Sequence, residues 1–296
     1  MTSSPFARVS VLGAGLMGGG IAQVSAVAGY PTVVRDLSGE ILDRARQGIR
    51  KSLAKLVEKG KLDEAAAGSA VARLEFTSEV ALAASADLVI EAVTEDLEIK
   101  NSLWRELDGL CPASTVFASN TSSLPIAAQA AATTRADRFV GLHFFSPVPL
   151  MPLVEVVRAV STSGETFDRA MAFAQSLGKE AVAARDTPGF IVNRLLVPYL
   201  MDAVRALDAR VASTRDIDLG MKLGCGHPMG PLTLLDLIGL DTALRVGEIM
   251  YDEFREPQYA APPLLRRMVS AGLLGRKSGR GFYDYGREPP EPVKLP

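Results

Sequence analysis

Short apolar runs alternate with amphipathic stretches through the first two thirds of the chain. Residues 8–12 (RVSVL) form a β-branched run that stops at a glycine, which predicts a buried strand. A helical stretch at 16–29 and a second strand at 32–36 follow, so the chain opens with a βαβ unit. Residues 41–60 then repeat apolar positions at helical spacing.

The same alternation continues to about residue 185. Helical spacing occurs at 96–109 and 165–177, and strand-like runs occupy 87–91, 115–118, 138–143, 153–157 and 181–183. Strands that alternate with helices predict an α/β fold, with a mainly parallel sheet covered by helices on both faces.

The pattern changes at residue 186. Helical segments follow near 190–209, 214–223, 231–253 and 262–272, without a convincing strand. The first is apolar around much of its circumference, which is typical of a helix buried in a core or in a subunit contact. We therefore predict a sheet domain at 1–185 and an all-α domain at 186–296.

Composition excludes several classes of partner. The 296 residues include 48% hydrophobic and 22% charged residues, with a formal net charge of -2. This charge provides no basic surface for nucleic acid and no polybasic patch for a membrane. Two cysteines cannot form a disulfide framework, and no apolar run approaches the ~20 residues that span a bilayer. We expect a cytoplasmic location.

A glycine motif follows the first strand. Gly13-Ala14-Gly15-Leu16-Met17-Gly18 matches G-x-G-x-x-G between a strand and a helix, where backbone amides bind a pyrophosphate. Asp36 ends the second strand and is placed to accept hydrogen bonds from ribose hydroxyls. The motif predicts a Rossmann-type domain that binds NAD, although flavin shares the fingerprint. Asp36 disfavours the extra phosphate of NADP, and neighbouring Arg35 weakens that effect.

One histidine stands near an unusual glutamate. His143 ends the run RFVGLH, and Glu155 lies between two valines in the next strand. A carboxylate in so apolar a strand is costly to bury without a partner. Paired, the two would form the base and its orienting group in a proton-transfer site. A structural histidine and a solvent-facing edge glutamate explain the same two residues, so both interpretations stay open.

Other polar residues have a structural and a functional interpretation. Ser122 lies in SNTSS, just past the strand at 115–118, where ligands bind in open parallel sheets but where helix caps also occur. Asn193 is an amide on the apolar helix that starts near residue 190. Cys225 and His227 form only C-x-H, too little for a metal site, so we expect no metal.

These blocks together resemble the short-chain L-3-hydroxyacyl-CoA dehydrogenases, which include the bacterial 3-hydroxybutyryl-CoA dehydrogenases. The resemblance covers almost the whole chain, through VSVLGAGLMGGGIAQ, EAVTEDLEIK, FASNTSSL, GLHFFSPVPLMPLVEVV, DTPGFIVNRLLVPYLMDA, HPMGPLTLLDLIGLD and GRKSGRGFYDY. Two departures stand out, namely Pro152, where relatives often carry lysine, and Arg35, where an apolar or aromatic residue is commoner.

The resemblance implies a role for each matching residue. His143 corresponds to the catalytic base, Glu155 to its partner, and Ser122 and Asn193 to the groups that hold the substrate oxygen. Glu95 and Lys100 join Gly13, Gly15, Leu16, Met17, Gly18 and Asp36 as implied cofactor contacts. Ser52 and Lys59 fall where the family contacts CoA. The helical domain is expected to close over the acyl chain and to form a homodimer.

Other functions remain as alternatives. The same reaction could take place on a substrate bound to an acyl-carrier protein, and the residues do not distinguish this carrier from CoA. A non-catalytic, crystallin-like relative would need none of Ser122, His143, Glu155 and Asn193. A sugar-acid dehydrogenase of neighbouring type is disfavoured by the long match through FIVNRLLVPYLMDA. Acyl-chain length, direction and pathway stay open.

Overall fold

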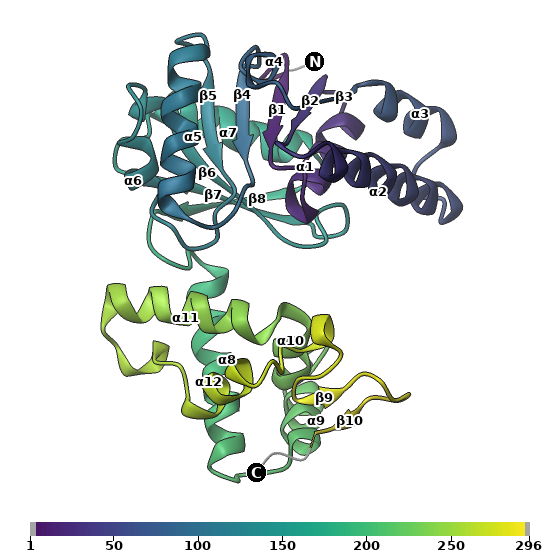
Figure 1. Cartoon of the computed structure of the whole chain (residues 1–296), viewed down its shortest axis with the longest axis vertical. Coiled ribbons are helices and arrows are strands. Elements are labelled where there is room, and N and C mark those ends of the chain that lie inside the picture. Colours follow the sequence, from purple (N-terminus) through teal and green to yellow (C-terminus); the bar gives the residue numbers. More distant parts are fainter. Residues whose placement is uncertain (1–3, 294–296) are drawn as a thin grey trace. The chain divides into compact units, whose positions relative to one another are not determined.

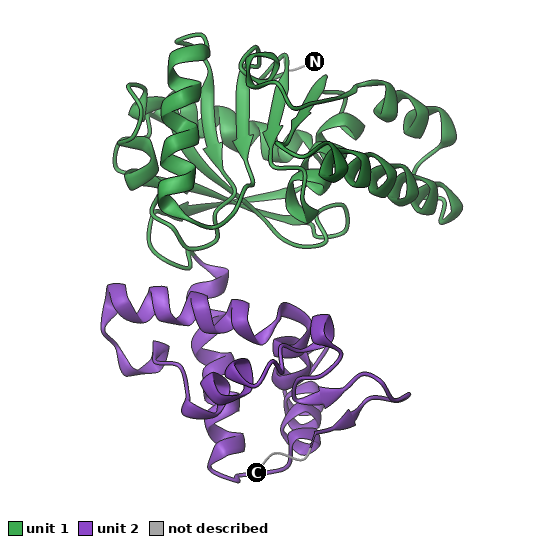
Figure 2. Ribbon diagram, in the orientation of Figure 1, with its two compact units in different colours: residues 1–190 green, residues 191–296 purple. Residues whose placement is uncertain are grey.

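The computed structural model describes residues 4–293 and divides into two compact units, Met1–Phe190 and Ile191–Pro296 (Figure 2). The predicted boundary at residue 186 lies five residues too early. The Asp186 carboxylate accepts hydrogen bonds from the backbone N–H groups of Ile126 and Ala127, both in unit 1. Phe190 is buried in the core of that unit. Tertiary contacts of this kind, invisible to a periodicity argument, extend unit 1 beyond the last strand.

Unit 1 contains one eight-stranded sheet in the order β3-β2-β1-β4-β5-β6-β7-β8 (Figure 1). Neighbouring strands from β3 to β6 are parallel, β7 runs antiparallel to β6, and β8 is parallel to β7. The strands are β1 Val9–Leu12, β2 Thr32–Arg35, β3 Leu74–Thr77, β4 Leu88–Glu91, β5 Val116–Ser119, β6 Phe139–Phe144, β7 Leu153–Arg158 and β8 Glu180–Arg185. The mainly parallel sheet is confirmed, but β3 was missed because this edge strand is only half-buried and lacks an apolar run.

Helices cover both faces of this sheet. Ile21, Leu42 and Phe173 bring α1, α2 and α7 onto the core of one face, while Ala83, Trp104 and Ile126 bring α4, α5 and α6 onto the other. The helices of unit 1 are α1 Leu16–Val27, α2 Gly39–Glu58, α3 Glu64–Ala72, α4 Val80–Ala83, α5 Leu97–Leu110, α6 Ile126–Ala130, the 3-10 turn η1 Ala136–Arg138, and α7 Gly164–Ser176.

Unit 2 packs its helices around a separate core. Its elements are α8 Val192–Asp208, α9 Thr214–Gly224, α10 Pro231–Ile238, α11 Leu240–Phe254, η2 Pro257–Tyr259, α12 Pro263–Ser270, η3 Arg276–Ser278, β9 Tyr283–Asp284 and β10 Glu291–Pro292. The helix predicted at 231–253 is broken at Gly239, whose φ of +100° interrupts it. The small β9–β10 ribbon also departs from a strictly all-α unit. Among the described residues, no helix is both long and apolar enough to cross a membrane.

Candidate active site

The glycine motif forms the turn between β1 and α1. Gly13 adopts a φ of +91°, and a Cβ there would lie 2.6 Å from the carbonyl oxygen of Ala92. A Cβ on Gly18 would lie 1.7 Å from the carbonyl oxygen of Gly13, so only glycine lets helix and strand approach this closely. Gly15 has nothing within 4 Å of its missing Cβ, which leaves open space beside the start of α1. This space suits a pyrophosphate approached by backbone N–H groups.

Asp36 follows β2 and lies beside the glycine turn. One of its carboxylate oxygens accepts a hydrogen bond from the Ala14 N–H at 2.8 Å, and the other accepts one from Ser38 N–H at 3.2 Å. The side chain is partly exposed, so it remains accessible to ribose hydroxyls. The neighbouring Arg35 donates a hydrogen bond from Nε to the carbonyl of Ser78 at 3.3 Å. The turn and the carboxylate together fit NAD.

A buried ion-pair network joins the carboxyl ends of β4 and β5. Lys100, on α5, places its Nζ 2.5 Å from Glu91 Oε1 and 3.2 Å from Glu95 Oε2. Glu91 also accepts hydrogen bonds from the Ser119 hydroxyl and the Val93 N–H. Burial raises the pKa of Glu91 despite the neighbouring ammonium. The ammonium of Lys100 thus binds both carboxylates near the carboxyl ends of these strands.

Glu95 links this network to the SNTSS turn by hydrogen bonds. Its Oε1 accepts hydrogen bonds from the Thr121 hydroxyl at 2.5 Å, the Ser122 N–H at 3.0 Å and the Ser123 hydroxyl at 3.1 Å. Burial acts to raise the pKa of Glu95, but Lys100 and these hydrogen bonds outweigh burial and lower the pKa below its ordinary value. The structure therefore brings Glu95, Lys100 and Ser122 together, as carboxylate, cation and hydroxyl.

His143 and Glu155 form a direct pair. They are register partners across the antiparallel strands β6 and β7, and His143 Nδ1 lies 2.6 Å from Glu155 Oε2. Glu155 is fully buried and His143 is 6% exposed. The imidazole also packs against the rings of Phe145 and Phe190, at centroid distances of 4.5 and 5.6 Å. The solvent-facing glutamate of the structural alternative is thereby excluded.

The other candidates belong to other elements of the chain. Ser52 is half-buried on α2, and Lys59 is exposed at the C-terminal cap of that helix. Asn193 is partly buried on α8, in unit 2. His227 makes a hydrogen bond to the Tyr199 hydroxyl through Nδ1 at 3.1 Å, which fits its structural interpretation. No group of three metal-binding side chains gathers anywhere in residues 4–293.

Sequence reasoning missed Glu91. The signal was present, since a carboxylate ends the apolar run DLVIE much as Glu155 interrupts LVEVV. Both carboxylates are fully buried, and both are bound to a basic side chain.

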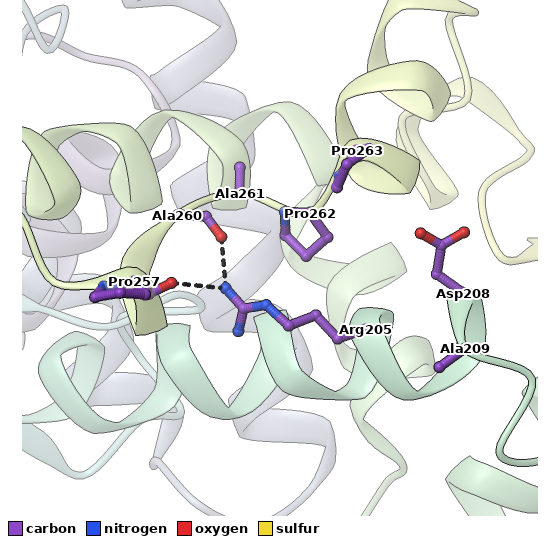
Figure 3. A pocket seen from close by; sticks show the side chains of 8 residues that line it. All are labelled: Arg205, Asp208, Ala209, Pro257, Ala260, Ala261, Pro262 and Pro263. Atoms are coloured by element: carbon purple, nitrogen blue, oxygen red, sulfur yellow. Dashed lines mark hydrogen bonds between the residues drawn. The ribbon is translucent and has the colours of Figure 1, made fainter.

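A pocket of about 450 Å³ in unit 2 contains none of these residues (Figure 3). Its wall includes Arg205, whose guanidinium donates to the backbone carbonyls of Pro257 and Ala260. The arginine therefore joins α8 to the segment before α12 and is already engaged by backbone acceptors.

Comparison with known proteins identifies the family. Residues 8–187 match the model of the 3-hydroxyacyl-CoA dehydrogenase NAD-binding domain, and residues 189–285 match that of the C-terminal domain of the same family. The chain belongs to the 3-hydroxyacyl-CoA dehydrogenase family. It is an NAD-dependent oxidoreductase, and unit 1 carries the cofactor-binding domain.

Individual relatives are similar in sequence to this protein over nearly the full length of both chains. The chain is 49% identical to a probable 3-hydroxybutyryl-CoA dehydrogenase of Deinococcus radiodurans, over 94% of this chain and all of that one. It is 46% identical to the human mitochondrial hydroxyacyl-coenzyme A dehydrogenase, over 94% and 91% of the two chains. The crystal structure of (S)-3-hydroxybutyryl-CoA dehydrogenase from Ralstonia eutropha superposes with a TM-score of 0.92 at 45% identity, over 95% and 100% of the two chains.

Proposed function

We propose that this family member interconverts short-chain (S)-3-hydroxyacyl-CoA and 3-oxoacyl-CoA, with 3-hydroxybutyryl-CoA and acetoacetyl-CoA as the reacting pair. The observation that carries the proposal is the 2.6 Å contact between His143 Nδ1 and buried Glu155. Relatives at 49% and 45% identity bear the name of 3-hydroxybutyryl-CoA dehydrogenase, which supports the short acyl chain.

His143 is the proton acceptor in this proposal. Its Nδ1 is engaged by Glu155, so Nε2 is the ring nitrogen that meets the substrate hydroxyl. NAD, when bound, would supply the hydride acceptor for the carbinol carbon, and His143 Nε2 takes the hydroxyl proton. Glu155 keeps the ring oriented and stabilises the imidazolium. In the reverse direction the same nitrogen returns the proton to the alkoxide oxygen.

Ser122 and Asn193 position the substrate oxygen. Ser122 is suited to this because its backbone is held by Glu95 while its side chain remains partly exposed. Such positioning of donor and acceptor contributes much of the rate enhancement in a hydride transfer. Asn193 belongs to α8, and we assign it the second hydrogen bond to this oxygen.

The cofactor and carrier contacts follow the same assignment. Gly13, Gly15, Leu16, Met17 and Gly18 form the pyrophosphate turn, Asp36 binds the adenine ribose, and Glu95 and Lys100 are assigned further cofactor contacts. Asp36 favours NAD over NADP by like-charge repulsion. Ser52 and Lys59 on α2 contact CoA; if they do not, an acyl-carrier protein is the remaining carrier.

The helical unit 2 is assigned closure over the acyl chain and homodimer formation. It leaves large apolar side chains exposed on α8, α9 and α10, namely Leu195, Leu219, Leu223 and Leu237. Exposed apolar surface of this kind is typical of a subunit contact. Light scattering with size-exclusion chromatography would give twice the chain mass of 31.4 kDa, and a monomer would refute the dimer. The cytoplasmic location stays a prediction.

The test of the reaction is the absorbance of reduced nicotinamide during mixing with acetoacetyl-CoA. We expect rapid loss of NADH absorbance and much slower loss with NADPH, because Asp36 repels the extra phosphate. Equal rates would assign Arg35 a role in accepting NADPH. No loss from folded protein that binds NADH would refute the CoA thioester as substrate, and the same assay on an acyl-carrier-protein thioester would then identify the carrier.

A further inference from the structure

The loop between β6 and β7 joins the two strands that carry His143 and Glu155. We call residues 145–152 the β6–β7 loop. Within it, the backbone N–H groups of Leu150 and Met151 both donate to the carbonyl of Pro147. In sequence, the loop connects the strand of His143 to the strand of Glu155. A change in the position of the loop can therefore change how the two side chains are aligned.

Lys179, which lies between α7 and β8, binds this loop. Its Nζ donates hydrogen bonds to the carbonyl oxygens of Val148 and Met151, both at 2.7 Å. A backbone contact next to Lys179 strengthens the attachment, because the Glu180 N–H donates to the Pro152 carbonyl at 2.7 Å.

The ammonium of Lys179 forms its hydrogen bonds with backbone carbonyls. Within residues 4–293 this lysine forms no ion pair, although the protein has exposed carboxylates such as Glu75 and Glu291. Burial lowers the pKa of Lys179, which reflects the cost of keeping the charge away from water. Hydrogen bonds from a charged donor to carbonyls are about twice as strong as neutral ones, so they offset part of that cost.

The opposite side of the loop rests on the cofactor helix. Val148 is buried in the core that also contains α1. A Cβ on Gly20 of α1 would lie 2.8 Å from Val148 Cβ, so the missing side chain lets the loop lie directly on this helix. Gly20 follows the pyrophosphate turn by two residues. The loop is thus bound between α1 and Lys179.

We propose that Lys179 is a positioning residue, which holds the β6–β7 loop against α1 and thereby aligns the His143–Glu155 pair with the cofactor turn. The inference rests on the proposed function of that pair. Lys179 acts through the backbone carbonyls of Val148 and Met151. Removing its ammonium should therefore change turnover more than binding.

Kinetics of three variants test this role. Lys179→Met retains the aliphatic stem without the ammonium, and we expect kcat for acetoacetyl-CoA reduction to fall about tenfold while KM for NADH stays within about twofold. Lys179→Arg keeps a cationic donor and should recover most of the lost kcat. Lys179→Ala makes room for a small amine, so methylammonium should restore part of its turnover. Lys61→Ala, at an exposed lysine in unit 1, is the control and should match wild type.

Hydrogen exchange provides a readout that does not depend on activity. The amides of Leu150 and Met151 should exchange faster in Lys179→Met than in wild type, while amides of β1 remain unchanged. Unchanged exchange and unchanged kcat would overturn the proposal, as would faster exchange without loss of kcat. If the loop loosens but wild type does not reduce acetoacetyl-CoA, the assigned substrate fails and the attachment by Lys179 stands.

Discussion

His143 and Glu155 face each other across β6 and β7, and the imidazole Nδ1 lies 2.6 Å from the carboxylate. Directly opposite residues in an antiparallel pair have side chains close enough to interact, so the reversal of β7 creates this contact. Glu155 is fully buried, where an unpaired carboxylate would be strongly destabilising. The imidazole satisfies the carboxylate, and the carboxylate orients the imidazole.

Replacing His143 by alanine removes the proton acceptor. We expect kcat to fall about 100-fold or more, the scale of general acid–base catalysis. The glycine turn and Asp36 are untouched, so NADH should bind with nearly unchanged affinity in a fluorescence titration. Wild-type turnover in this variant would remove His143 from the mechanism.

Two substitutions at Glu155 separate charge from packing. Glu155→Gln keeps a hydrogen-bond acceptor for Nδ1–H but loses the negative charge that stabilises the imidazolium, so kcat should drop about tenfold with little change in thermal stability. Glu155→Ala also leaves the buried ring nitrogen without its partner and should cost a further ~1–3 kcal/mol of unfolding free energy. Both quantities come from steady-state kinetics and urea denaturation. Equal kcat for Glu155→Gln and wild type would show that charge plays no part.

Ser122 and Ser123 form a matched pair in the SNTSS turn. Ser123 is buried and its hydroxyl is bound to Glu95, whereas Ser122 is partly exposed and its hydroxyl lies 3.5 Å from that carboxylate. Ser122→Ala should lower kcat/KM for acetoacetyl-CoA about tenfold without loss of stability. Ser123→Ala should instead lower the melting temperature with a smaller kinetic effect. If the two variants exchange these phenotypes, Ser122 is a structural cap.

The lowered pKa of Glu95 predicts an acid-dependent stability. Its carboxylate is favoured in the folded state, so its contribution is present above the ordinary pKa of 4.5 and is lost as pH falls toward the lowered value. Glu95→Gln has no ionisable group at this position, so it lacks this pH-dependent contribution at every pH. The difference in unfolding free energy between wild type and Glu95→Gln should therefore shrink below pH 4.5. A difference that stays constant from pH 6 to pH 3.5 would contradict the assignment.

The two cysteines should differ sharply in reactivity. Burial raises the pKa of the Cys111 thiol to about 11, and this side chain is 8% exposed, while Cys225 is exposed. The thiolate is the reactive form of cysteine. In native protein at neutral pH, a disulfide reagent should therefore react rapidly with one thiol, that of Cys225. Cys225→Ser should abolish the fast phase, and unfolding should release the second thiol. A fast phase of two equivalents would show that Cys111 is accessible.

Features that depend on neighbours in the chain were predictable. The glycine turn, the βαβ opening and the mainly parallel sheet follow from local apolar spacing and from the backbone freedom of glycine. The two valines beside Glu155 in the same strand indicated that its carboxylate would need a partner if buried, while a solvent-facing glutamate stayed open as the alternative. The C-terminal helices were located by their spacing, but the break at Gly239 was not, since one glycine inside a helical pattern is often tolerated.

The sequence by itself determined which chemical groups this protein carries and near which strand ends they lie. The tertiary structure decided which groups meet, namely His143 with Glu155, Lys100 with Glu91 and Glu95, and Lys179 with the β6–β7 loop. It also moved the unit boundary to Phe190 through contacts made by Asp186. The physical reason is that strand register and buried ion pairs depend on packing between segments far apart in the chain, whereas periodicity reports only one segment at a time.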